Sequence, residues 1–271
     1  MQANTLYHQI KHRMPLPAAR LRLAPMLGVL AILALWQLVT MLQVYPAFII
    51  PSPAAVLAEF RAVLVDGRLW LHTSTTLGQM LIGLAAGLAL AVALGYAIAK
   101  NRALEAALSP IIVAFQSTPV VAYAPLLVIW FGSGPTSKII TSALIVFFPM
   151  LMNTIVGVRG VPAPLRELMR SLRATRWQMF SKLEVPAALP VLFGGLKVSA
   201  TLAVIGAVVG EFVSSNAGLG FLINTARSQY NTPLVFVAVL TLALIARLMY
   251  GLIALLEQRA LAWQARVQKG G

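Results

Sequence analysis

The amino-acid sequence predicts an all-α integral membrane protein with about six transmembrane helices. Hydrophobic residues make up 59% of the 271 residues and charged residues only 10%, whereas ordinary soluble domains carry roughly 25% charged residues. The mean hydropathy is +0.85, and the apolar residues gather in runs long enough to cross a hydrocarbon core of about 30 Å. A separate soluble domain does not fit beside these runs.

Six apolar runs mark the expected spans. They cover residues 25–44, 73–99, 106–131, 138–158, 189–213 and 233–256. The first run follows a basic head, residues 1–24. It is longer than the apolar region of a secretory signal and has no small-residue cleavage site after it. We therefore expect an uncleaved first span, a membrane domain over residues 25–256 and a tail over residues 257–271.

The basic residues predict which side of the membrane each loop faces. The net charge is +14, but the Lys and Arg residues are spread through the short stretches between spans, which suits membrane topology rather than nucleic-acid binding. With the head placed inside, 15 basic residues fall on the inner side and four on the outer side. The positive-inside rule then places both termini in the cytoplasm.

A short helix is expected on the outer side, between the first two spans. Ser52 can cap this helix, Pro53 suits its first position, and Asp66-Gly67 ends it. Its apolar residues recur on one face, which favours a helix that lies along the membrane surface or packs on the spans.

Two glycine pairs lie one helical turn apart within the spans, Gly83 with Gly87 and Gly206 with Gly210. Small residues at this spacing let two helix backbones approach closely in lipid. We expect them to pack helices within the chain, with a seam between two copies as the alternative.

The third span combines three prolines with polar residues at membrane depth, so we expect a kinked or interrupted helix. Non-helical backbone survives in a bilayer only inside protein or beside a watery cavity. A translocation path is one interpretation and a purely structural kink is the other. The residues assigned to such a path are Gln116, Thr118, Pro119, Pro125, Asn153 and Glu211.

Ionisable residues at membrane depth are costly and are weighed singly. Lys197 can extend its side chain to the inner interface. Arg247 lies near the middle of the last span and is expected to face the protein interior or a cavity. Glu211, at the outer end of the fifth span, is expected to pair with a basic residue or to lie at the interface.

Enzymatic chemistry has no set of residues to carry it. The chain has no Cys and three His, without a pair at metal-ligand spacing or a Ser/His/Asp set, so neither a metal site nor a catalytic site is predicted. The segment from Gly132 to Lys138 lacks the GxxxxGK[ST] spacing of a phosphate loop. We therefore predict that the chain does not hydrolyse ATP by itself.

The long inner loop, residues 159–188, is basic and amphipathic. Leu165, Leu168, Met169 and Leu172 recur at helical spacing. A second short pattern, of Trp177, Phe180 and either Leu183 or Glu184, is expected to end at Pro186. From the residues alone, two occupants of the apolar face remain open: the anionic membrane surface and a groove in a partner protein.

A family resemblance rests on this loop. Glu167-Leu168-Met169, then Arg173, then Leu183-x-Val185-Pro186 resembles the EAA loop, EAA-x3-G-x9-I-x-L-P, of permease subunits of bacterial ABC importers. Arg173 stands where the family has glycine. Similarity to the nitrate, sulfonate and taurine group extends to Ile50–Pro53, Ala124–Gly132, Phe148-Pro149, Gly194–Lys197 and Gly210–Phe212.

The resemblance implies a type I ABC importer permease fold in the bacterial inner membrane. Its implied partners are a second copy of the permease, two cytoplasmic ATP-binding subunits, which would hold the ATP and Mg²⁺, and an extracytoplasmic solute-binding protein. It also implies that the loop couples to the ATPase. The residues assigned to this coupling are Leu165, Glu167, Leu168, Met169, Leu172, Arg173, Trp177, Phe180, Leu183 and Pro186.

The transported solute is left open between two groups. The resemblance favours a sulfonate, taurine or nitrate, and similar permeases import thiamine-precursor pyrimidines, riboflavin or aromatic acids. A self-sufficient secondary transporter is the alternative from another class, although the clear internal repeat and the acidic groups that it would need are missing.

Overall fold

The computed structural model describes residues 18–262, with side chains from residue 26 onward. These residues form helices and turns, without a strand among them. The elements are α2 (Ala18–Met41), α3 (Pro53–Val65), α4 (Arg68–Lys100), α5 (Arg102–Ser117), the 3₁₀ helix η1 (Val120–Tyr123), α6 (Ala124–Phe131), α7 (Pro135–Arg159), α8 (Ala163–Ser171), α9 (Arg176–Met179), the π-helix η2 (Phe180–Glu184), α10 (Val185–Val213), α11 (Leu219–Ser228) and α12 (Thr232–Ala260). Residues 1–17 of the predicted head and 263–271 of the predicted tail lie outside the described residues.

Two compact units divide the chain, Met1–Ala58 and Glu59–Gly271. In the first unit, the Trp36 indole donates a hydrogen bond of 3.0 Å to the Pro51 carbonyl. The predicted outer helix is present as α3: the Ser52 hydroxyl accepts from the Ala55 amide and Pro53 is its first residue. Gly67 follows the helix with a φ of 80°, a conformation that favours glycine.

Most of the second unit consists of helices long and apolar enough to cross a membrane. Four qualify among the described residues: α4, α7, the run Arg176–Val213, and α12. The predicted third span is a pair of helices, α5 and η1–α6, that meet at 88°. The predicted first span corresponds to α2, whose apolar part, Met26–Met41, is shorter than these four helices.

The bend in the third span falls at Thr118 and Pro119. Proline has no amide hydrogen, and its ring pushes the preceding residue out of the helical region, so the helix cannot continue through this position. Thr118 is accordingly extended, at φ −97° and ψ 127°. The predicted interruption of this span is confirmed.

The glycine pairs allow α4 and α10 to pack closely against α7. A Cβ added at Gly83 would lie 2.6 Å from Ser142 Cβ, and one added at Gly206 would lie 2.5 Å from Ser142 Cα. The Ser142 hydroxyl donates to the Ala203 carbonyl at 3.0 Å. Both pairs therefore pack helices within the chain, as predicted, and α7 is the central helix of this unit.

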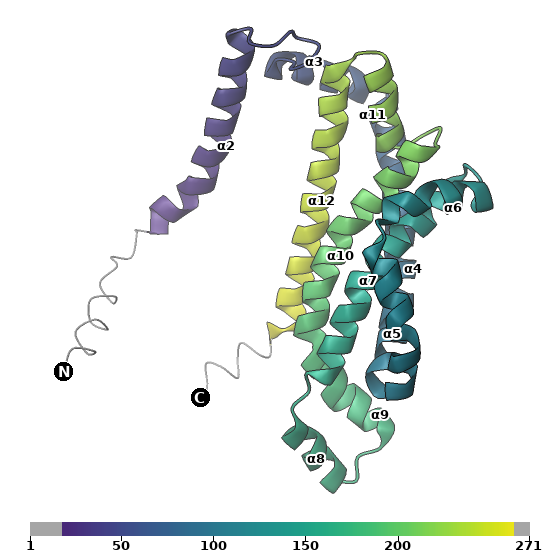
Figure 1. The fold of residues 1–271 in the computed structure, drawn as a ribbon. Coiled ribbons are helices and arrows are strands. Elements are labelled where there is room, and N and C mark those ends of the chain that lie inside the picture. Colours follow the sequence, from purple (N-terminus) through teal and green to yellow (C-terminus); the bar gives the residue numbers. More distant parts are fainter. Residues whose placement is uncertain (1–17, 263–271) are drawn as a thin grey trace, which may run out of the picture. The chain divides into compact units, whose positions relative to one another are not determined.

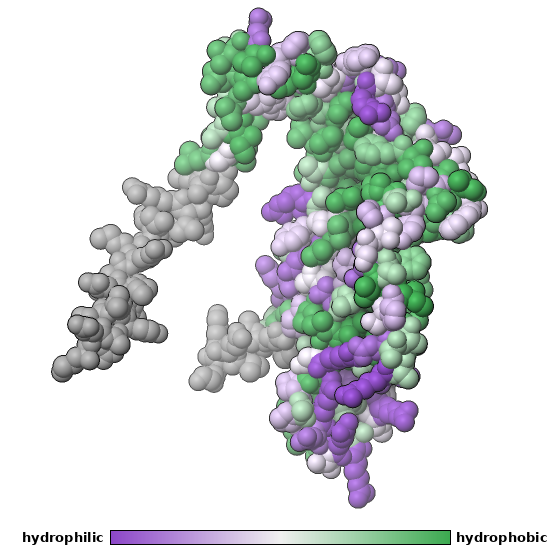
Figure 2. Space-filling view, in the orientation of Figure 1, coloured by the Kyte–Doolittle hydropathy of each residue, from purple (hydrophilic) through white to green (hydrophobic). Residues whose placement is uncertain are grey.

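The two ends of the second unit differ in polarity. The helices α6 and α11 lie towards one end, and α8 and α9 lie at the other (Figure 1). Figure 2 shows hydrophilic side chains gathered over the end with α8 and α9, whereas hydrophobic side chains cover much of the helices above it. This separation is typical of a membrane protein with one basic cytoplasmic end.

One boundary prediction is wrong. Pro186 does not end the second helix of the loop, because α9, η2 and α10 form the continuous run Arg176–Val213. Pro186 stands in the first turn of α10, and the preceding η2 is wound more widely, with the Val185 amide donating to the Phe180 carbonyl. The π-helix thus accommodates the missing proline amide without a break.

Candidate functional site

The first helix of the inner loop presents an apolar face that nothing in the described chain covers. Pro162 precedes α8 and Pro164 lies in its first turn, where the missing amide costs nothing. Leu165, Leu168 and Leu172 lie on this face and are 44%, 55% and 68% exposed. We call this face the α8 stripe; Glu167 is exposed beside it and Met169 is half-buried.

The α8 helix ends in a left-handed turn at Arg173, whose φ is 53°. The Arg173 amide donates to the Arg170 carbonyl at 2.9 Å, and the Ala174 amide donates to the Met169 carbonyl at 3.0 Å. These two bonds form a Schellman motif, in which the left-handed position is usually glycine. Arg173 therefore occupies a left-handed position that glycine usually fills, at a conformational cost.

The second part of the loop forms an elbow, residues 175–186, that packs on the chain itself. Thr175 and Gln178 cap α9 reciprocally. The Phe180 ring meets the Tyr96 ring of α4 edge-on, with centroids 5.2 Å apart, and the Trp177 ring lies 5.4 Å from that of Phe180. The structure thus places Trp177 and Phe180 beside α4 and not on the α8 stripe.

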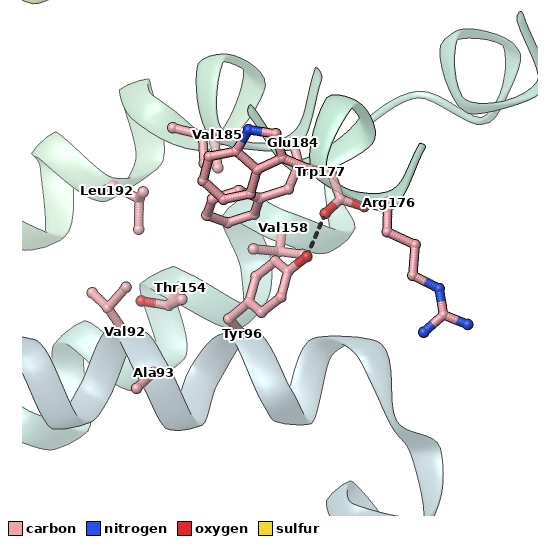
Figure 3. Close-up of a pocket in the computed structure, with 12 residues that line it drawn as sticks. Val92, Ala93, Tyr96, Thr154, Val158, Arg176, Trp177, Glu184, Val185 and Leu192 are labelled. Carbon is pink, nitrogen blue, oxygen red and sulfur yellow. Dashed lines mark hydrogen bonds between the residues drawn. The ribbon is translucent and has the colours of Figure 1, made fainter. Parts of the chain in front are cut away.

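A buried carboxylate holds the elbow to α4 (Figure 3). Glu184 is 1% exposed; the Tyr96 hydroxyl donates to it at 2.9 Å, and the Lys100 ammonium forms an ion pair with it. Leu183 and Pro186 on either side are half-buried. Glu184 is expected from the sequence only as an alternative position of the loop pattern and not as an anchor, although a carboxylate two residues before a proline, with Lys100 at the end of another span, is a detectable signal.

A groove runs between α5 and α7. Two adjacent cavities, of about 450 and 330 Å³, form it and share the lining residues Gln116 and Met152. Apolar side chains supply most of the wall, and Pro149 and Val120 lie at its end near the bend. Among the predicted path residues, Gln116 lies in this groove and Pro119 marks the bend beside it.

One aromatic ring, that of Phe148, lines this groove, and other rings pack against it or beside it. The Phe115 and Phe148 rings lie nearly parallel, with centroids 6.4 Å apart and planes inclined by 22°. Tyr123 lies 5.9 Å from Phe115, and Phe147 meets Phe148 edge-on at 5.1 Å. Such faces favour contact with a flat, apolar ring.

The groove carries one ion pair, at its inner end. Nη1 and Nη2 of Arg159 each donate to one oxygen of the Glu105 carboxylate at 2.7 Å, and Nη2 also donates to the Ile98 carbonyl at 3.2 Å. The positive charge of Arg159 is therefore matched within the groove.

The remaining predicted path residues lie elsewhere. The Thr118 hydroxyl donates a hydrogen bond to the Ala114 carbonyl, and Pro125 lies in the first turn of α6. Asn153 packs on Gly195 of α10, and its amide donates to the Pro149 carbonyl at 2.8 Å. A contact of these residues with solute stays a prediction.

Glu211 is enclosed at the outer end rather than lying at an interface; it is 1% exposed. It accepts from the Thr76 hydroxyl at 2.7 Å and from the Gly220 amide at 2.6 Å. These bonds fasten α11 to α4 and α10. Lys138, counted with the outer loops in the sequence, is also 1% exposed and donates to the Ser133 carbonyl at 2.6 Å. The path assignment of Glu211 remains a prediction.

Two other ionisable residues differ in their surroundings. Lys197 forms an ion pair with Glu257 of α12 at 2.5 Å. Arg247 is exposed on α12 and lines an open cavity with its neighbours on that helix; of the two expected surroundings, it is therefore the cavity and not the interior of this chain. The helix rotation that turns Ile245 inward turns Arg247 outward.

Comparison with known proteins assigns the family. Residues 83–261 match the family described as binding-protein-dependent transport system inner membrane component. A riboflavin transport system permease protein of Chloroflexus aurantiacus is 48% identical to this chain, in a match that covers 86% of this chain and 87% of that protein. A taurine transport system permease protein of Escherichia coli is 31% identical, in a match that covers 89% of this chain and 90% of that protein. An inward-facing MetNI methionine ABC transporter chain has the same fold, with a TM-score of 0.64 at 20% identity, over 71% of this chain and 97% of that one.

These matches define the class of protein. The chain is a multi-pass inner-membrane permease with the type I importer fold, and it belongs to the binding-protein-dependent transport family. It is the permease subunit of an ABC importer, the non-enzymatic membrane component of such a system.

Proposed function

We propose that this permease imports a flat, largely uncharged heteroaromatic solute, such as a flavin, along the groove between α5 and α7. The observation that carries the proposal is the wall of the groove, where apolar side chains and the Phe148 ring, itself packed near Phe115, accompany one ion pair that is already matched. A second copy of the chain faces the groove and completes the path.

The groove suits a ring better than a small anion. A sulfonate or nitrate needs hydrogen-bond donors or an unmatched cation to replace its water. Arg159 is committed to Glu105, whereas Phe148 offers a ring face and the Gln116 amide offers both a donor and an acceptor. The riboflavin permease that is 48% identical over most of its length supports the same solute class.

The energy for transport comes, in this proposal, from two cytoplasmic ATP-binding subunits that hold ATP and Mg²⁺. The α8 stripe docks into a groove of such a subunit, because its three exposed leucines bury only against a partner. Glu167 lies at the edge of this contact. An extracytoplasmic binding protein delivers the solute to the outer end.

Motion passes from the docked loop to the groove through continuous packing. The elbow leads into α10 without a break, and α10 packs closely on α7, which forms one wall of the groove. A displacement of α8 on ATP binding therefore moves α10 and α7 together. This coupling depends on the buried Glu184 bonds to α4, which keep the elbow from moving alone.

The orientation follows from charge. The end with α8 and α9 carries the hydrophilic side chains shown in Figure 2 and most of the basic residues, so it is placed in the cytoplasm. Both chain termini are placed on the same side.

Transport by the reconstituted complex tests the solute class. Uptake of radiolabelled riboflavin and taurine is measured in proteoliposomes with the accompanying subunits. We expect riboflavin uptake, reduced at least tenfold by Phe148→Ala and little changed by Phe131→Ala, which removes an exposed ring outside the groove. Taurine uptake without riboflavin uptake would overturn the proposal.

Co-purification tests the docking surface. Leu168→Glu should abolish recovery of the ATP-binding subunit from detergent-solubilised membranes, because it places a charge in the centre of the α8 stripe. Arg170→Gln on the same helix serves as the control. Undiminished recovery with Leu168→Glu would show that α8 is not the docking element.

A further inference from the structure

A third cavity lies apart from the groove, between α4, α7 and the elbow (Figure 3). Its volume is about 620 Å³. Its wall is formed mainly by aliphatic and aromatic side chains, among them Ala93, Leu192, Trp177 and Phe180. We call this space the elbow cavity.

The polar groups that α4, α7 and η2 contribute to the lining of the elbow cavity are already bonded to the protein. The Tyr96 hydroxyl donates to Glu184 at 2.9 Å, and the Thr154 hydroxyl donates to the Met150 carbonyl at 2.8 Å. Glu184 receives Lys100 as well. Water and polar solutes need several free partners in a cavity, so the interior favours hydrocarbon.

The volume suits an aliphatic chain. An engineered apolar cavity of about 150 Å³ holds one benzene molecule. The elbow cavity is roughly four times as large and therefore has room for some twenty carbon atoms, on the order of one acyl chain, by the same comparison. It lies next to Val92, which faces outward from α4 in the spanning region.

The rim of the elbow cavity is positively charged. In Figure 3 the Arg176 side chain extends away from the rings and out of the cavity. Within residues 26–262 its guanidinium forms no hydrogen bond or ion pair, Lys182 follows it on the next turns of the elbow, and Lys100 reaches the cavity through its ion pair with Glu184. Lys100 keeps 44% of its side chain exposed. Basic side chains at the cytoplasmic surface attract anionic lipid headgroups.

We propose that the elbow cavity binds one acyl chain of an anionic phospholipid, whose headgroup phosphate is held by Arg176. The bound chain fills the space between α4 and the elbow and contacts the Trp177 ring. The lipid thereby becomes part of the structure that carries motion from the coupling loop to α10. The site does not depend on which solute the permease transports.

Quenching of Trp177 fluorescence tests the proposal on the full-length chain in nanodiscs. The other four tryptophans, Trp36, Trp70, Trp130 and Trp263, are replaced by Phe. The discs contain unlabelled phosphatidylcholine and a small fraction of one lipid with brominated acyl chains. This brominated lipid is phosphatidylglycerol in one set of discs and phosphatidylcholine in the other. Brominated phosphatidylglycerol should quench at a concentration about fivefold lower than brominated phosphatidylcholine does. This ratio corresponds to ~1 kcal/mol for one basic side chain near an anionic surface.

Matched variants separate the acyl-chain site from the headgroup site. Ala93→Phe fills the cavity and should abolish the preferential quenching, whereas Ala89→Phe, one turn away on the exposed side of α4 and outside the cavity, should not. Arg176→Gln should remove the preference for phosphatidylglycerol, whereas Arg170→Gln on α8 should keep it. Native mass spectrometry of the chain with all five tryptophans should show one retained phosphatidylglycerol, lost with Ala93→Phe.

Three results would overturn the proposal. Equal quenching by both brominated lipids would exclude the anionic headgroup site. Identical quenching in the Ala93→Phe and Ala89→Phe variants would exclude the cavity as the place of the chain. Relief of quenching by oleate but not by unbrominated phosphatidylglycerol would identify a free fatty acid as the occupant instead. Should Ala93→Phe fail to fold, the comparison of the two brominated lipids on the parent chain decides.

Discussion

The close packing of α7 leads to a prediction about a single methyl group. Gly206→Ala places a Cβ 2.5 Å from the Cα of Ser142 on the neighbouring helix. Both positions are backbone atoms or are rigidly attached to the backbone, so rotation of a side chain cannot relieve the clash. Gly194→Ala, in the same helix, adds a Cβ with nothing within 4 Å and is the matched control.

The difference in stability between the two variants isolates the strain. Each substitution gains helix propensity of up to ~1 kcal/mol relative to glycine, and this gain cancels in the comparison. Ordinary contacts begin at about 3.4 Å, so α7 and α10 must separate by nearly 1 Å at Gly206, and overpacking of this kind costs roughly 1–3 kcal/mol. With about 2–4 °C per kcal/mol for domains of 150–250 residues, Gly206→Ala should melt some 2–12 °C below Gly194→Ala.

Thermal unfolding in detergent, followed by the loss of monodisperse protein on size-exclusion chromatography, measures this difference. Both variants are expressed and purified in parallel with the parent chain. Equal melting temperatures for the two alanine variants would refute the argument that α10 and α7 are held at backbone contact through Gly206.

Three further predictions concern the inner end. Arg173→Gly should raise the melting temperature, because glycine removes the roughly 1–2 kcal/mol cost of a left-handed residue, less the entropy it adds to the unfolded chain; an unchanged or lower value would argue against the left-handed turn. Lys100→Gln should destabilise the protein more than Glu184→Gln, because it leaves a buried carboxylate without its cation, whereas the partly exposed Lys100 can turn to water; the reverse order in melting temperature would contradict the buried network. Glu105→Arg with Arg159→Glu should restore transport lost in either single variant, as a double-mutant cycle of uptake rates would show, and additive losses would exclude a direct pair.

Many of the helix starts, breaks and apolar faces could be predicted from single residues and short runs. The break at Pro119 follows from a missing amide hydrogen and a clash with the preceding residue, both within one turn of helix. The cap at Ser52 and the amphipathic face of α8 are equally local. Pro186 does not end its helix, because the wider turn of η2 before it accommodates the missing proline amide. At Pro119 the same missing amide interrupts the helix.

The functional surroundings of particular side chains depend on contacts that no local pattern contains. Glu184 meets Tyr96 across 88 residues, and Glu211 meets Thr76 across 135. Asn153 and Gln116 are both polar and both near a proline, yet one packs on α10 and the other lines the groove, because helix rotation points them to different neighbours.

Three properties can be predicted without any structure: that the chain is a membrane protein, where most of its spans lie, and which loop resembles a coupling loop. They depend on hydrophobic length, charge and proline chemistry along the chain. The residues that line the groove, and the apolar cavity behind the elbow, could be found only in the folded structure. Those features arise from the rotation and spacing of helices against one another, which are set by packing between distant segments.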